Sequence, residues 1–126
     1  MDKSIGKYEK CENVKLEIYN KFKNRYETVP VDLILELIHV SNEIIKEIEV
    51  LIHSHHFQNE YVFHTYYELF VITSLFIADK LLNDEQITNL DYIQSLCHHK
   101  YNKEMIAKAE FMLIPYVHYV KTLNLL

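Results

Sequence analysis

The stretch that most constrains the fold lies between Tyr66 and Asn89, where a helix-length segment is apolar on every side. Its apolar positions follow one another without leaving a polar face: Leu69, Val71, Ile72, Leu75, Phe76, Ile77 and Ala78. A helix with no polar face must be buried, and a chain of 126 residues has room for one such core. The sequence therefore predicts a central helix over 66–82, on which the other helices pack.

Polar residues mark both ends of this central helix. Thr65 followed by Glu68 has the spacing of a capping box, in which a hydroxyl and a carboxylate each accept a hydrogen bond from an otherwise unpaired backbone N–H. A polar run over 83–86 marks the end of the helix. Lys80 is unusual because it lies on the last apolar turn.

The composition predicts an all-helical protein. The chain has one glycine, two prolines and 49 % hydrophobic residues, whereas sheets and long loops use more turn-forming residues. The net charge of −5 argues against nucleic-acid binding, which needs clustered Lys and Arg, and favours a protein partner. There is no long uncharged apolar run and no signal-peptide centre, so we expect no membrane binding and an intracellular protein of the nucleus and/or cytoplasm.

The spacing of apolar residues divides the chain into helices. We expect a flexible N-terminus over residues 1–10 and a single helical domain over residues 11–126. A first helix is predicted by apolar residues at four-residue spacing, namely Val14, Ile18, Phe22 and Tyr26. From Val31 to about residue 56, the pattern fits either one bent helix or two helices that separate near Ser41.

The second half of the chain has clearer boundaries. Residues 57–64 resemble a connection with partly buried aromatic side chains. Thr88 is a candidate cap for a short helix over 89–97, and Asn102 for a last helix that begins at Lys103. Pro115 should kink or end that last helix. The segments together predict an all-α bundle of five or six short helices.

Histidine is the residue type that most nearly forms a site in the sequence: His53, His55, His56, His64, His98, His99 and His118. His53 and His56 share a helix face, which suits two metal ligands, but no carboxylate or cysteine repeats at ligand spacing nearby. The chain also lacks a glycine-rich phosphate loop and a nucleophile elbow. We therefore expect no enzyme activity, no metal and no cofactor, and we interpret Cys11 and Cys97 as ordinary thiols.

Residues 70–89, followed by a short helix and by residues 103–114, resemble the second half of a cyclin box. Within the cyclins they are most similar to the P-type (phosphate-pathway) and Y-type groups, whose central helix ends in an Ala-Ser-Lys element, followed by an Asp and a Tyr-Thr-Asn element. The residues that stand at these positions are Ala78, Asp79 and Lys80, then Asp84, then Ile87, Thr88 and Asn89. The resemblance implies a cyclin-box-like bundle of five core helices with an extra N-terminal helix.

The resemblance also implies a function and a binding site. Cyclins use a lysine and a glutamate, here Lys80 and Glu110, to hold the segment that leads into the regulatory C-helix of a cyclin-dependent protein kinase. The apolar part of the kinase-binding site would include Leu81, Leu82, Phe111 and Ile114. The expected protein is thus a kinase regulator of the cell-cycle class, which activates its kinase by stabilising the active C-helix arrangement.

Two departures from the family pattern and three alternatives accompany this interpretation. The Asp-Arg pair of many cyclins is absent near His53 and Ser54, and Pro115 falls where the last helix of the family continues. One alternative is a cyclin-fold adaptor or transcription-related interaction module without a kinase partner. A second is a small metal-binding helical protein that uses the histidines. A third is a homodimer formed through the apolar tail over 116–126.

Overall fold

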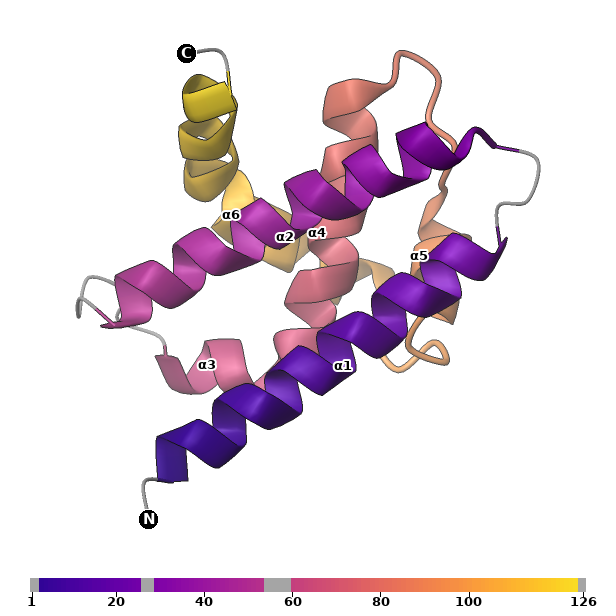
Figure 1. Cartoon of the computed structure of the whole chain (residues 1–126). Helices are drawn as coiled ribbons and strands as arrows, with labels where there is room; N and C mark the ends of the chain where they lie inside the picture. Colours follow the sequence, from indigo (N-terminus) through magenta and orange to yellow (C-terminus); the bar gives the residue numbers. More distant parts are fainter. Residues whose placement is uncertain (1–2, 26–28, 54–59, 125–126) are drawn as a thin grey trace.

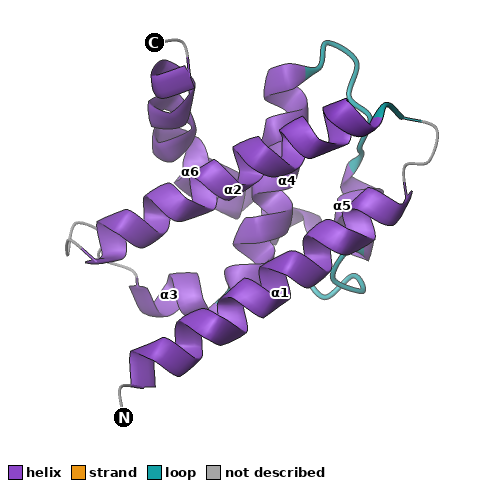
Figure 2. Ribbon diagram, in the orientation of Figure 1, coloured by secondary structure: helices purple, strands orange, loops and turns teal. Residues whose placement is uncertain are grey.

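The computed structural model describes residues 3–25, 29–53 and 60–124, and it describes the side chains of residues 10–24, 29–51 and 61–117. These residues form helices and connecting loops without a strand, as Figure 2 shows. The helices are α1 (Lys3–Arg25), α2 (Val31–His53), α3 (Glu60–Thr65), α4 (Tyr67–Leu82), α5 (Leu90–Ser95) and α6 (Lys103–Asn124). The all-α class expected from the composition is confirmed.

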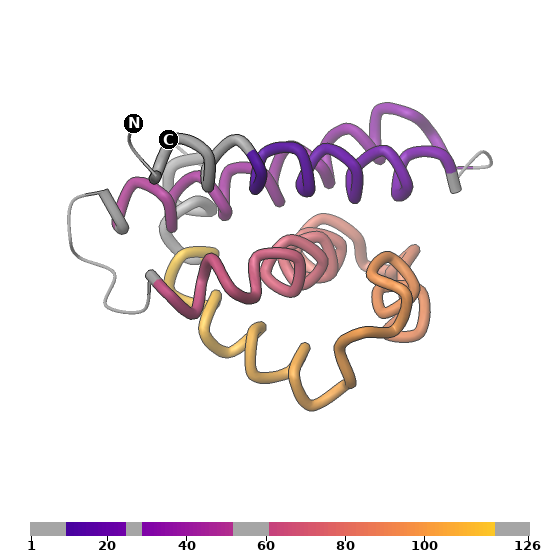
Figure 3. The backbone as a smooth tube through the Cα atoms, turned by 90° about the horizontal axis from the view of Figure 1, so that it is seen from below, coloured from indigo at the N-terminus to yellow at the C-terminus, as the bar shows by residue number. Residues whose placement is uncertain are grey.

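Helix α4 is the centre of the bundle. It contacts each of the other five helices. Helices α1 and α2 form one layer, and α4 crosses behind them between that layer and α6 (Figures 1 and 3). Every residue of α4 from Leu69 to Asp79 is buried, because neighbours cover it on all sides. This confirms the central helix predicted from its missing polar face.

The start of α4 differs from the predicted capping box. The residue before the helix is Tyr66, and no side chain caps it. The backbone continues from α3 almost without a break, since Tyr66 N–H donates to Val62 O and Phe70 N–H donates to Tyr66 O. Helical bonds thus satisfy donors that a cap would otherwise serve. The expected connection over 57–64 accordingly contains α3, and its Phe63 is fully buried against Tyr67.

Residues 31–53 form one helix, α2, and Ser41 does not cap a second one. Ser41 faces inward, where its Oγ lies 2.8 Å from the Tyr19 hydroxyl and 2.5 Å from Ser74 Oγ. Ser74 Oγ in turn donates to the Val71 carbonyl. This buried chain of hydroxyls joins α1, α2 and α4, so it holds the three helices in one register.

Replacing Ser41 by alanine should lower the free energy of unfolding by about 1 to 3 kcal/mol, because the buried Tyr19 hydroxyl loses its partner. Urea denaturation measures this loss. Tyr19→Phe is the matched change on the other side of the bond, and the double variant should lose less than the sum of the two single losses. Strictly additive losses would show that this bond contributes no energy of its own.

The two terminal helices are longer than the sequence pattern indicated. Helix α1 begins at Lys3, well before Cys11, and the predicted stripe buries Ile18 and Phe22, while Tyr26 lies outside the described residues. Helix α6 starts after Asn102, whose side chain accepts from the Met105 N–H as predicted. It does not end at Pro115 but continues to Asn124.

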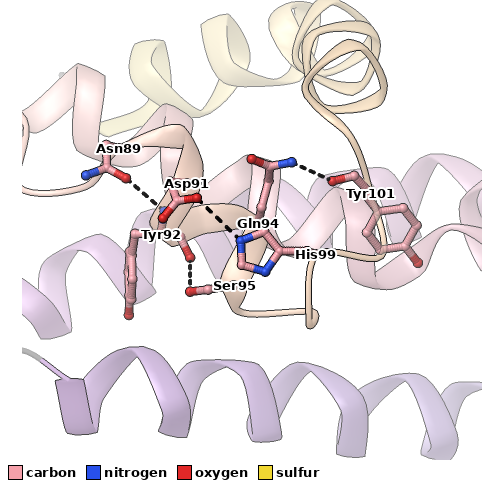
Figure 4. Close-up of polar contacts among 7 residues, drawn as sticks. All are labelled: Asn89, Asp91, Tyr92, Gln94, Ser95, His99 and Tyr101. Carbon is pink, nitrogen blue, oxygen red and sulfur yellow. Dashed lines mark hydrogen bonds and ion pairs between the residues drawn. The ribbon is translucent and has the colours of Figure 1, made fainter.

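Helix α5 is short and is held by polar contacts at both ends (Figure 4). Its cap is Asn89, which accepts from the Tyr92 N–H, so the predicted cap Thr88 was wrong by one position. Beyond the helix, the Gln94 amide donates to the Tyr101 carbonyl. His99 has a positive φ of 59°, and its Nε2 lies 3.5 Å from an oxygen of Asp91.

Candidate protein-binding site

Lys80 and Glu110 meet where the last turn of α4 packs beside α6. The Lys80 ammonium donates to Glu110 Oε1 at 2.6 Å, although 30 residues separate the two in sequence. The same ammonium lies 4.2 Å from the centroid of the Phe76 ring, one turn earlier on α4. A carboxylate and an aromatic face therefore hold the cation in one place.

The pair is open to solvent. The side chains of Lys80 and Glu110 are 39 % and 29 % exposed. An ion pair in such surroundings contributes little to folding, typically about 0.2–1 kcal/mol. The bond from Lys80 uses Oε1 of Glu110, and the other carboxylate oxygen has no hydrogen-bond partner in the described part of the chain. The pair thus presents a fixed cation and a free acceptor to solvent.

Large apolar side chains are exposed on both helices that carry the pair. All four apolar residues implied by the cyclin resemblance are among the exposed large hydrophobic residues: Leu81, Leu82, Phe111 and Ile114. Phe111 is 76 % exposed, which is unusual for a phenylalanine beside a well-filled core. Exposed apolar residues that border a fixed charge pair are typical of a protein-binding surface.

Helix geometry determines which of these residues share a face. Ile114 lies one turn after Glu110 and on the same side of α6, while Phe111 flanks that side. On α4, the exposed Leu81 points about 100° around the helix from Lys80 and so flanks it, whereas Leu82 points about 200° around, to the opposite side. We define the charged-pair patch as Lys80, Leu81, Glu110, Phe111 and Ile114. Leu82 is exposed but is not part of this patch.

Asp79 anchors the loop that follows α4, a role that the sequence pattern did not indicate. It is fully buried, and its carboxylate accepts from Asn83 Nδ2 at 2.7 Å and from the Ile87 N–H at 3.2 Å. Its other oxygen accepts from the backbone N–H and the hydroxyl of Thr88 at 2.8 and 2.5 Å. One side chain thus anchors the loop between α4 and α5. The sequence did contain one signal for this role, because Asp79 is a carboxylate within an otherwise apolar helical segment.

The histidines do not form a metal site within the described residues. There, no three His, Cys, Asp or Glu side chains gather at metal-binding distance. The side chains of His53 and His118 and the whole of His55 and His56 lie outside the described residues. Cys97 is buried, and burial raises the pKa of its thiol to about 12.

The C-terminal tail is partly engaged with the rest of the bundle. Its first residues, Tyr116 and Val117, pack against the core, and the helical backbone continues to Asn124. The side chains beyond Val117, on which the homodimer alternative depends, lie outside the described residues. None of the helices in the described ranges has the length and apolarity that crossing a membrane requires.

Comparison with known proteins returns no relative. The chain matches no family model, no curated protein and no solved structure.

Proposed function

We propose that this protein is a single-box cyclin that binds a cyclin-dependent protein kinase and activates it. The observation that carries this proposal is the contact between Lys80 and Glu110 at a solvent-exposed position. The cyclin resemblance assigns this lysine and this glutamate to one task, holding the segment that leads into the kinase C-helix. Two residues that share this task need to lie together at an accessible position, and contact between two solvent-exposed side chains supports the proposal.

The surroundings of the pair suit recognition of a backbone segment. A peptide carbonyl can accept from the remaining N–H groups of Lys80, and a peptide N–H can donate to the second oxygen of Glu110. Because Glu110 and the Phe76 ring already hold the lysine, little side-chain entropy is lost on binding.

The apolar members of the charged-pair patch would provide most of the binding energy. Exposed aromatic and aliphatic side chains that become buried in a complex are the usual energetic centres of an interface. Phe111 is the largest of them and the most exposed. The charged pair then fixes orientation and partner choice.

The effect on the kinase would be conformational. In a kinase with an outward-rotated C-helix, the glutamate that should pair with the ATP-positioning lysine is misplaced. A partner that binds the inward arrangement better shifts the population toward it, and a shift from 1:99 to 99:1 requires about 5.5 kcal/mol of differential affinity. An interface of standard size, about 1,600 Å² in total, is large enough to provide such a difference.

Titration against a panel of the organism's own cyclin-dependent kinases tests this function. We expect submicromolar binding to at least one kinase, and at least tenfold weaker binding for Lys80→Ala, Glu110→Ala or both together. A tenfold loss corresponds to about 1.4 kcal/mol. Thermal melting should change little, because the pair is exposed.

A charge-swapped variant, Lys80→Glu with Glu110→Lys, separates recognition from folding. The swap restores the internal ion pair but exchanges the positions of cation and acceptor. We expect it to melt like the wild type and still bind the kinase at least tenfold more weakly. If the swapped variant or the double alanine variant bound the kinase with wild-type affinity, Lys80 and Glu110 would not be part of the interface. A folded protein that binds no kinase would instead indicate the cyclin-fold adaptor.

A further inference from the structure

A second polar site lies at the opposite end of α4 from the charged-pair patch. A cavity of about 320 Å³ opens between α1, α3 and the first turn of α4. Its walls carry several groups able to form hydrogen bonds or react, among them Lys10, Cys11, His64, Thr65 and Tyr67. The proposed kinase-binding function uses none of these residues.

Cys11 and His64 form a thiol–imidazole pair in this cavity. Cys11 Sγ lies 3.9 Å from His64 Nδ1, and the two residues come from different helices, 53 positions apart in sequence. Both side chains are half-buried, so a small molecule can reach them. An adjacent imidazole can take the thiol proton and leave a thiolate, which is the nucleophilic form of cysteine.

Tyr67 provides an independent sign that the cavity accommodates a bound group. Its side chain is only 4 % exposed, and its hydroxyl has no hydrogen-bond partner within the described residues. Burial raises the pKa of the Tyr67 hydroxyl, and the negative charge of Glu49 raises it further. The hydroxyl therefore stays protonated and is able to donate a hydrogen bond. A buried hydroxyl normally has a partner, and an acceptor atom of a ligand in this cavity would supply one.

We propose that Cys11 is a reactive thiol that forms a mixed disulfide with a low-molecular-weight disulfide bound in this cavity. His64 accepts the thiol proton, and the Cys11 thiolate attacks one sulfur of the bound disulfide. The new S–S bond forms as the old one breaks, and the other half leaves as a thiolate that takes the proton from His64. Cys11 is oxidised, the leaving half is reduced, and the Tyr67 hydroxyl donates a hydrogen bond to the half that stays.

Cys97 is the matched thiol for comparison within the same chain. It is buried, and the raised pKa of about 12 keeps it protonated at neutral pH. Reaction of the folded full-length chain with glutathione disulfide at pH 7 should therefore give one adduct. Peptide mapping by mass spectrometry should locate the adduct at Cys11, and Cys11→Ser should abolish it.

The pH dependence of the rate identifies the role of His64. The other titratable or charged groups that line the cavity or interact electrostatically with the Tyr67 hydroxyl are Lys10, Glu12, Tyr19, Glu49, Tyr61 and Glu68. Of these side-chain types and histidine, only histidine normally changes charge between pH 5 and 8. His64→Gln should lower the rate at pH 7 about tenfold, and its rate should fall about tenfold per pH unit below pH 8. Between pH 8 and pH 7 the wild-type rate should fall much less steeply, because the imidazole still accepts the thiol proton there.

Tyr67→Phe should also lower the rate but leave the shape of the pH profile unchanged. Thermal melting of each variant shows whether it is folded, and the wild-type comparison of Cys11 with Cys97 needs no variant. Equal reaction of the two thiols, or a wild-type rate that falls about tenfold between pH 8 and pH 7, would overturn the proposal. So would a folded His64→Gln variant with the wild-type rate and profile.

Discussion

Replacing Asp79 by alanine should lower the free energy of unfolding by about 3 to 5 kcal/mol. The buried carboxylate accepts from Asn83, from the Ile87 N–H and twice from Thr88. Without it, the donors of the buried Thr88 are left in the interior without a partner. The free energy of unfolding of a native protein is only about 5–15 kcal/mol in total, so this one change should bring the protein close to unfolding.

Urea denaturation followed by circular dichroism measures the loss, and two variants control for it. Asp79→Asn keeps the shape of the side chain, but its N–H₂ group faces hydrogen-bond donors where the carboxylate oxygen accepted from them. We therefore expect a loss of stability between those of the wild type and Asp79→Ala. Asp84→Ala removes an exposed carboxylate from the same loop and should change stability by less than about 0.5 kcal/mol. Faster amide hydrogen exchange at Ile87 and Thr88 should accompany Asp79→Ala. A loss below about 1 kcal/mol would mean that other contacts hold the loop.

Replacing Phe76 by alanine should cost about 3 to 5 kcal/mol, because it opens a cavity in the central helix and removes the ring beside Lys80. Phe111→Ala is the matched change, since it removes the same atoms from a side chain that is 76 % exposed. It should change stability by less than about 0.5 kcal/mol. The two phenylalanines should therefore differ by several kcal/mol in their effect on folding.

In kinase binding we expect the reverse: among folded molecules, Phe111→Ala should weaken the affinity more than Phe76→Ala. Phe111→Ala should weaken binding about tenfold or more at unchanged stability, because Phe111 lies in the charged-pair patch. For Phe76→Ala, binding should fall mainly with the fraction of folded protein, and a titration corrected for that fraction measures the remainder. If Phe111→Ala destabilised the domain as much as Phe76→Ala, Phe111 would belong to the core and not to a binding surface.

Local pattern was enough to predict the helical class and the central helix. A segment with apolar residues on every side, from Leu69 to Ala78, has no stable place outside a core, so its burial follows from composition alone. The cap at Asn102 was likewise local, because the cap and the N–H that it accepts from are three residues apart. Such features depend on residues close together in the chain.

Helix boundaries were less predictable, because several residues had two local uses. Ser41 has the chemistry of a cap, yet it serves as a buried hydroxyl between Tyr19 and Ser74. Thr88 also suits a cap, but its hydroxyl donates to Asp79 and leaves the cap of α5 to Asn89. Whether such a residue caps a helix or forms a buried tertiary hydrogen bond depends on which distant group packs beside it, and a local pattern does not contain that information.

What the sequence by itself determined is therefore the all-helical class, the helix that must be central, and the residues to examine for binding. Only the tertiary structure decided which of those residues meet. Lys80 contacts Glu110 across 30 residues, and Cys11 contacts His64 across 53, because helices from separate parts of the chain pack against the same central helix. Helix formation depends on near neighbours in the chain, whereas contacts of this kind depend on how whole helices pack together.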